Sequence, residues 1–164
     1  MPHSRYLADL PLDQRWFEDY VVGTIVDVGE VEFTEADIIA YALRFDPQYI
    51  QIDPVRAKDG PFGGLIASGF HTLAGSMRLF VDKYLSSVAA IASPGIDAMR
   101  FHLPVRPGDR LRLRIEVMES RRSASKPDRG IMRNHVDVLN QNHEVVLSHE
   151  PMNMLFCRPG ERAV

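Results

Sequence analysis

Residues 45–71 read Phe-Asp-Pro-Gln-Tyr-Ile-Gln-Ile-Asp-Pro-Val-Arg-Ala-Lys-Asp-Gly-Pro-Phe-Gly-Gly-Leu-Ile-Ala-Ser-Gly-Phe-His, and they separate two segments with helical periodicity. Pro47 disfavours helical geometry at Asp46, so a helix that ends near Phe45 should hold this carboxylate in a turn. The glycines at positions 60, 63, 64 and 69 allow backbone shapes and close approaches that side chains would block. A carboxylate at one helix end, followed by a glycine-rich start of a second helix, is suited to form half of an active site, because rigid elements hold the loop on both sides.

Both flanking segments are predicted to be amphipathic helices. Thr34 is the expected N-cap of the first helix, which ends near Phe45. Its buried stripe is predicted to consist of Ile38, Tyr41, Ala42 and Phe45. The second helix is predicted from Gly69 to Leu85, and Gly75 within it lowers helix propensity, so we expect another element to pack closely there. Its apolar face is predicted to consist of Phe70, Leu73, Ala74, Met77, Phe80, Val81 and Tyr84. Between the two helices, Asp53-Pro54 predicts a short helical turn through Lys58.

The rest of the chain is predicted to be β-structure. A first strand is expected at residues 20–28, after an extended N-terminal arm (residues 1–19) whose Trp16 and Phe17 pack on the body. Alternating apolar positions predict further strands at residues 99–105, 111–117, 130–139 and 144–156.

The connections complete the expected fold. Pro107-Gly108-Asp109 and residues 140–143 are predicted turns, and Pro151 indicates a bulge or an edge position in the last strand. This order of elements predicts one α+β domain over residues 1–164, in which an antiparallel sheet wraps around one long central helix.

Composition and charge exclude several classes of protein. The 164 residues are 45% hydrophobic and 25% charged, which is typical of one globular domain. The net charge of -3 gives no electrostatic reason to expect a nucleic-acid partner. No apolar run approaches the ~20 residues that cross a bilayer, and the first residues lack the apolar core of a signal peptide. Together with the single cysteine, Cys157, these features predict a cytoplasmic protein without membrane contact.

Three motifs, in this order, resemble the MaoC-like acyl dehydratases, which are related to the (R)-specific enoyl-CoA hydratases. They are Phe45-Asp46-Pro47-Gln48 with Ile52-Asp53-Pro54, then the segment Phe62–Thr72, and then Val105-Arg106-Pro107-Gly108-Asp109. The resemblance covers residues 21–156 and implies a hotdog fold. It also implies a homodimer or higher homo-oligomer, with acyl-thioester sites at the subunit interface. The implied substrate is a thioester of coenzyme A or acyl carrier protein, without a separate cofactor.

The resemblance places the catalytic aspartate on Asp46, but the family's catalytic histidine, five residues later, falls on Gln51. Hydration of a 2-enoyl thioester needs a base that takes a proton from water and an acid that protonates the α-carbon. An amide can hold the water but does not titrate near neutral pH. Losing one positioned proton-transfer group typically costs on the order of 100- to 10,000-fold in rate. Either Asp46 performs both proton steps slowly, or the chain has kept the acyl-binding architecture without the reaction.

Ser68 and Gly69 begin the second helix. Helix capping alone would explain both residues, and the resemblance adds that the Gly69 N–H polarises the thioester carbonyl. Gln48 is expected to help orient the water. The remaining substrate-binding candidates are Tyr49, Ile50, Ser68, Phe70, His71 and Leu73.

Two histidines are further candidates for the missing imidazole. His71 lies on the central helix, which favours a role in packing or at an interface, and His102 is the second candidate. The spacing of the other histidines does not match a metal site, so no metal is expected.

Three functions follow from these observations. The leading hypothesis is a hydro-lyase of the enoyl-CoA hydratase or acyl dehydratase type, in which Asp46 is the base, Gln51 orients water and the Gly69 amide stabilises the enolate. The second hypothesis is a non-catalytic acyl-CoA-binding or assembly subunit, and the third is a hotdog thioesterase.

Overall fold

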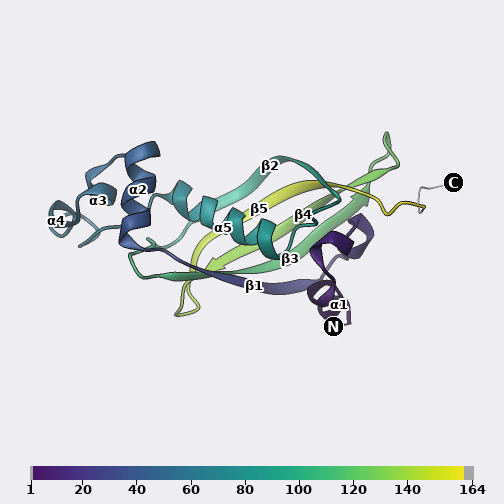
Figure 1. The fold of residues 1–164 in the computed structure, drawn as a ribbon, viewed down its shortest axis with the longest axis horizontal. Coiled ribbons are helices and arrows are strands. Elements are labelled where there is room, and N and C mark those ends of the chain that lie inside the picture. The colour runs from purple at the N-terminus through teal and green to yellow at the C-terminus, as the bar shows by residue number, and fades with distance from the viewer. Residues whose placement is uncertain (1, 161–164) are drawn as a thin grey trace.

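The computed structural model describes the backbone of residues 2–160 and the side chains of residues 6–160. Five antiparallel strands form one curved sheet, and the long helix α5 (Gly69–Lys83) lies across one of its faces (Figure 1). The order across the sheet is β1-β3-β4-β5-β2. The strands are β1 (Ile25–Glu32), β2 (Ala90–Phe101), β3 (Arg110–Arg122), β4 (Arg129–Leu139) and β5 (Val145–Phe156). The predicted α+β arrangement, an antiparallel sheet around one long helix, is confirmed.

The core lies between α5 and the sheet, and β3 shows how the sequence forms it. Leu111, Leu113 and Ile115 are fully buried at alternate positions, whereas Arg112 and Arg114 between them reach the other face. The structure confirms the strands predicted at residues 111–117 and 130–139, and the turn predicted at residues 107–109. β2, in contrast, begins nine residues before the predicted start and ends at Phe101 instead of continuing to Val105.

Pro151 does not occupy an edge. It lies on β5, between β4 and β2, where it pairs with Ile96. The register shifts fall at other points of the β2–β5 pairing, one of them between Asp97 and Arg100 of β2. The prediction of an edge position for Pro151 is wrong, because β2 covers this side of β5.

The N-terminal segment is helical rather than extended. It consists of α1 (Pro2–Asp9) and two 3-10 turns, η1 (Leu12–Gln14) and η2 (Phe17–Asp19). Phe17 is buried against the body, as predicted for the aromatic residues of this segment. β1 begins at Ile25 instead of Tyr20, because residues 22–23 form a turn in which Gly23 has a φ of 83°. The buried Tyr20 hydroxyl donates to the Tyr84 carbonyl (3.0 Å) and accepts from the Ser86 N–H (2.8 Å). The Tyr20 side chain therefore binds the C-terminal end of α5, and Tyr20 is not part of β1.

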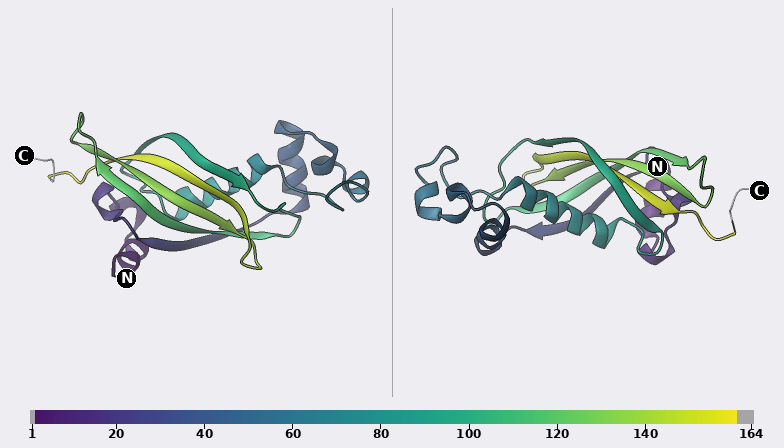
Figure 2. Two further views of the ribbon diagram at one scale, coloured as in Figure 1. Left: turned by 180° about the vertical axis from the view of Figure 1, so that it is seen from behind. Right: turned by 90° about the horizontal axis from the view of Figure 1, so that it is seen from above.

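The central helix buries only part of the predicted face, in which Phe80 and Tyr84 are buried as expected. Its buried residues are Thr72, Ser76, Leu79 and Phe80. Phe70 is 64% exposed and Val81 is 47% exposed, although both belong to the predicted apolar face. Figure 2 shows the sheet on one side of α5, and among the described residues no strand covers its other side. Gly75 does allow the expected close approach, because an added Cβ would lie 2.7 Å from the Phe33 ring.

Three further helices gather at one end of the sheet (Figure 1). α2 (Glu35–Phe45) begins at the predicted N-cap, where Thr34 accepts a hydrogen bond from the Asp37 N–H (3.1 Å). Ile38 and Ala42 are buried as predicted, whereas Phe45 is exposed. α4 (Pro54–Ala57) is the predicted turn, with Asp53 as its cap, and α3 (Tyr49–Ile52) forms where no helix was predicted.

Candidate active site

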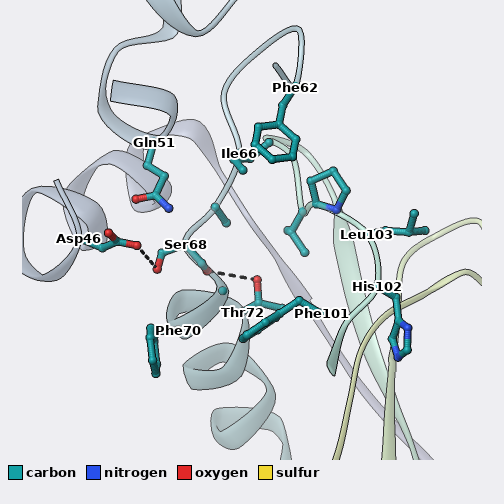
Figure 3. A pocket seen from close by; sticks show the side chains of 14 residues that line it. Asp46, Gln51, Phe62, Ile66, Ser68, Phe70, Thr72, Phe101, His102 and Leu103 are labelled. Carbon is teal, nitrogen blue, oxygen red and sulfur yellow. Dashed lines mark hydrogen bonds between the residues drawn. The ribbon is translucent and has the colours of Figure 1, made fainter. Parts of the chain in front are cut away.

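Asp46 lies at the C-terminal end of α2, where its backbone N–H still donates to the Ala42 carbonyl (2.8 Å). The turn that Pro47 requires directs the Asp46 carboxylate towards the start of α5. There the Ser68 hydroxyl donates to Oδ2 of Asp46 (2.7 Å), as Figure 3 shows. The Gln48 amide donates to Oδ1 (2.6 Å).

These contacts keep the carboxylate ionised. Hydrogen bonds from Gln48 and then Ser68 lower the pKa of Asp46, and they outweigh the opposite effect of burial. The Gln51 side chain adds a smaller contribution in the same direction. Asp46 is therefore an anion over the whole physiological pH range. In the resting protein it can act as a base but not as an acid.

A cavity of about 430 Å³ opens beside this carboxylate. Asp46, Gln51, Ser68 and Gly69 lie on its wall, and most of the remaining lining is apolar (Figure 3). The other lining residues are Phe62, Ile66, Ala67, Phe70, Thr72, Phe101, His102, Leu103, Pro104 and Val105. The cavity thus combines one anionic group with a surface that suits a hydrocarbon chain.

Gln51 projects into the same end of the cavity from α3. The side chain is only 5% exposed, and among the described residues its Oε1 has no hydrogen-bond partner. The structure therefore brings Asp46 and Gln51 to the same cavity, the two residues that the resemblance predicts as the catalytic pair.

The start of α5 forms the third part of the site. Ser68 occupies the N-cap position, but its side chain makes no capping hydrogen bond because its hydroxyl is directed to Asp46. Ser68 is therefore the N-cap residue, as the capping interpretation expects, but its side chain does not supply a capping hydrogen bond. The first N–H groups of a helix have no acceptor within the helix, and they carry the positive end of its dipole. Gly69 places this backbone on the cavity wall, where it can stabilise a developing negative charge.

Five of the predicted substrate-binding residues do not line the cavity within this chain. The Tyr49 ring packs beside Gly60 and under the Arg56 guanidinium, and the Ile50 carbonyl accepts from the Ile66 N–H (3.0 Å). Leu73 is partly buried against the core. Gln48 is also outside the lining and reaches the site through Asp46.

His71 is the fifth of these residues, and it is packed between aromatic rings. It stacks on Tyr41 with the two rings nearly parallel (4.6 Å, 6°) and contacts Phe33 at the same centroid distance. Burial lowers the pKa of His71, so this imidazole is neutral at neutral pH. The packing role expected for a histidine on the central helix agrees with these contacts.

Sequence reasoning missed much of the cavity wall. Phe62, Ile66, Thr72, Phe101 and Leu103 were not singled out, and residues 101–105 come from a distant part of the chain. The Ala67 N–H donates to the Val105 carbonyl (2.8 Å), which joins the two segments. For residues 101–105, the sequence signal was the motif that begins at Val105; Phe62, Ile66 and Thr72 lie within the motif Phe62–Thr72.

His102 lines the cavity, but its Nε2 is 2.7 Å from the Ser148 hydroxyl. Figure 3 shows its ring directed away from Asp46. The described residues contain no cluster of histidine, cysteine or carboxylate side chains suited to a metal ion, and no described helix is long and apolar enough to span a membrane.

Comparison with known proteins agrees with this geometry. The sequence pattern of the MaoC-like domain matches residues 20–139, so the chain belongs to the MaoC-like domain family. The uncharacterized protein YdeM of Bacillus subtilis is 30% identical over 133 residues, which cover 81% of this chain and 93% of YdeM. The 3-hydroxyacyl-thioester dehydratase Z of Mycobacterium tuberculosis is 44% identical over 84 residues, which cover 50% of this chain and 56% of the relative.

Solved structures share the fold. A MaoC-like dehydratase from Rhodospirillum rubrum superposes with a TM-score of 0.81 at 38% identity, covering 88% of this chain and 99% of that structure. More distant structures, one of them described as a double hotdog fold, show the same arrangement. The domain is therefore a hotdog fold, as the resemblance implied.

Proposed function

We propose that the protein is a hydro-lyase that adds water to a 2-enoyl thioester, or removes it from a 3-hydroxyacyl thioester, of coenzyme A or acyl carrier protein. The observation that supports this most directly is the Asp46 carboxylate, which is held by Ser68 at the start of α5 inside a mostly apolar cavity. The name of the M. tuberculosis relative, a 3-hydroxyacyl-thioester dehydratase, agrees with this reaction class.

In the hydration direction, Asp46 takes a proton from water while the water oxygen bonds to C3. The electrons of the double bond move onto the thioester carbonyl and form an enolate. The Gly69 N–H at the start of α5 stabilises this oxygen. Asp46 then returns its proton to C2, which completes the addition of one water molecule.

Gln51 has a supporting part in this scheme. Its carboxamide holds the water but exchanges no proton, so a single carboxylate performs both proton transfers. We expect the rate to be lower than in a site with a second titrating group, by on the order of 100-fold or more.

The test is the loss of crotonyl-CoA ultraviolet absorbance in the presence of purified protein, repeated with longer 2-enoyl-CoA chains. Turnover should be abolished in Asp46→Asn, which keeps the shape of the side chain but removes the base. No turnover above background with any chain length would reject the hydro-lyase function. Thiol release, followed with a disulfide reagent in the same reactions, would indicate a thioesterase instead.

A second candidate function is a non-catalytic acyl-thioester-binding subunit, and Gln51 favours it because an amide cannot act as the second acid–base group. Tight binding of acyl-CoA without turnover would support this role.

We also propose that the chain forms a homodimer through the uncovered side of α5. Phe70 and Val81 are exposed there, and β2 lies at the adjoining edge of the sheet. Exposed apolar helix faces beside a free strand edge favour association with a second copy.

A further inference from the structure

The ring of Phe101 lies against the start of α5 on the cavity side. Phe101 is the last residue of β2, and its half-exposed side chain lines the cavity. A Cβ built on Gly69 would lie 2.8 Å from both Cε1 and Cζ of this ring. The ring therefore fills the space that a side chain at position 69 would take, close to the Gly69 N–H.

A bulge in β2 precedes Phe101. Asp97 and Arg100 of β2 are three residues apart, whereas the residues of β5 with which they pair are only two residues apart. β2 therefore contains one extra residue in this stretch, and Ala98 within it has a φ of 50°. The left-handed region is unfavourable for alanine, so the fold keeps this bulge at a cost in stability.

The extra residue decides the face of the sheet on which Phe101 lies. Asp97 forms an ion pair with Arg133 (2.6 Å), whose neighbours in β4 are fully buried, so this pair lies on the face away from α5. Because side chains alternate along a strand, a regular strand would place Phe101, four residues after Asp97, on that same face. The bulge moves Phe101 to the face of α5 instead.

The position of the ring matters for the reaction proposed above, in which the Gly69 N–H binds the thioester carbonyl. The acyl group then lies between Asp46, which is held by Ser68, and Phe101. In Figure 3 the side chains of Asp46 and Phe101 lie on either side of the start of α5. The three heavy atoms nearest to the Cβ position of Gly69 all belong to the Phe101 ring. The ring therefore limits the room for substituents on C2, the carbon bonded to the thioester carbonyl.

We propose that Phe101 is a specificity-determining residue, which admits acyl thioesters that are unbranched at C2 and excludes those that carry a methyl branch there. The inference rests on the acyl-thioester function proposed above and adds the shape of the acyl group that the site accepts. A branch at C2 would have to displace the ring, and a straight chain would not.

The size of the discrimination follows from the surroundings of the ring. One methyl group in a closely fitting apolar pocket changes binding by about 10- to 200-fold. Phe101 is half exposed and belongs to an edge strand, so its ring can yield in part. We therefore expect the lower end of this range, about tenfold.

The experiment measures the equilibrium binding of butyryl-CoA and isobutyryl-CoA to the full chain by calorimetry. These two ligands are isomers that differ only in the branch at C2, and neither has a double bond or a hydroxyl group for the proposed reaction. The parent protein should bind butyryl-CoA about tenfold more tightly. Phe101→Ala should bring the two affinities to within about twofold, mainly through tighter binding of isobutyryl-CoA.

Phe156→Ala is the matched control. Phe156 is a partly exposed phenylalanine of β5, nine residues along that strand from Leu147, the partner of Phe101. The same change of side chain at this distance from the cavity should leave the tenfold preference as it is in the parent.

Each outcome decides a different point. Equal affinities in the parent protein would overturn the exclusion of branched acyl groups but leave the thioester function standing. A preference that persists in Phe101→Ala would overturn the assignment to Phe101. Binding of neither ligand would reject the thioester function, and this inference with it. If Phe101→Ala does not fold, Phe101→Leu provides the same comparison with a smaller side chain that lacks the ring.

Discussion

The hydroxyl of Ser68 donates a hydrogen bond of 2.7 Å to the carboxylate of Asp46, 22 residues earlier in the chain. This contact joins the end of α2 to the start of α5 and orients the proposed base towards the cavity.

Removal of this hydroxyl should weaken the base in a measurable way. In Ser68→Ala the pKa of Asp46 should rise, because one of the two main hydrogen bonds that lower it is lost. The acid limb of the pH–rate profile for crotonyl-CoA hydration should move to higher pH, and kcat should fall by about tenfold or more. Ser76→Ala is the control, because Ser76 is a buried serine of the same helix whose hydroxyl is paired with His149 (3.1 Å) instead. An acid limb that stays in place in Ser68→Ala would contradict this account of Asp46.

Introducing an imidazole at position 51 should restore the missing acid–base group. Gln51→His places a titrating side chain beside Asp46, and we expect kcat for 2-enoyl-CoA hydration to rise by on the order of 100-fold. A large gain would show that the rest of the site is competent. An unchanged rate, in a variant whose circular dichroism is that of the parent, would favour the non-catalytic binding function.

Gly69 should not tolerate a side chain. A Cβ at this position would lie 2.8 Å from the Phe101 ring, so Gly69→Ala should lower the free energy of unfolding by about 1–3 kcal/mol and reduce turnover. Chemical denaturation measures the first effect, and the crotonyl-CoA assay measures the second. The double variant Gly69→Ala/Phe101→Leu, with a smaller side chain opposite, should recover much of the lost stability. If Gly69→Ala is as stable as the parent, the close contact with Phe101 is not maintained in solution.

The fold should lose stability in mild acid through His149. Burial, and to a smaller extent the nearby His135, lowers the pKa of His149 to about 4 from an unfolded value of 6.5. Because the folded state resists protonation, the stabilisation is complete above pH 6.5 and is lost as the pH falls towards 4. Between pH 7.5 and 5 the free energy of unfolding should fall by ~2 kcal/mol from this residue.

Urea denaturation at both pH values measures this effect. His149→Leu, which cannot titrate, should show a smaller change between the two pH values than the parent protein. An equal change in both proteins would assign the acid sensitivity to other groups.

A charge on the uncovered side of α5 should separate the proposed dimer. Val81→Asp places a carboxylate on this apolar surface, and sedimentation analysis should show a monomer at concentrations where the parent is dimeric. Lys83→Asp, on a different side of the same helix, is the control for the change of charge and should remain dimeric. A parent protein that sediments as a monomer at all accessible concentrations would reject the homodimer.

Several elements could be predicted because their causes are local. Thr34 and Asp53 act as helix caps through hydrogen bonds that reach only two or three residues along the chain. The alternation in β3 likewise needs no knowledge of distant residues. The motif also placed Gln51 close to Asp46, because only five positions separate the two residues; its departure from the family pattern stays a prediction.

The buried face of α5 could be predicted only in part. Helical periodicity identifies an apolar stripe, but it does not state whether the chain's own sheet or another surface covers it. The structure buries Thr72 and Ser76 against the sheet and leaves Phe70 and Val81 exposed. Ser76 is compatible with burial because His149, on a distant strand, pairs with its hydroxyl.

The amino-acid sequence by itself determined the two long helices, α2 and α5, the caps at Thr34 and Asp53, and the strands β3, β4 and β5. These properties depend on backbone preferences and on side chains that are close in the chain. Only the tertiary structure decided that Ser68 holds Asp46, that residues 101–105 complete the cavity, and that Gln51 has a buried oxygen without a partner. These features arise where segments far apart in the chain meet, and the free energy of such contacts depends on the packing of the whole domain.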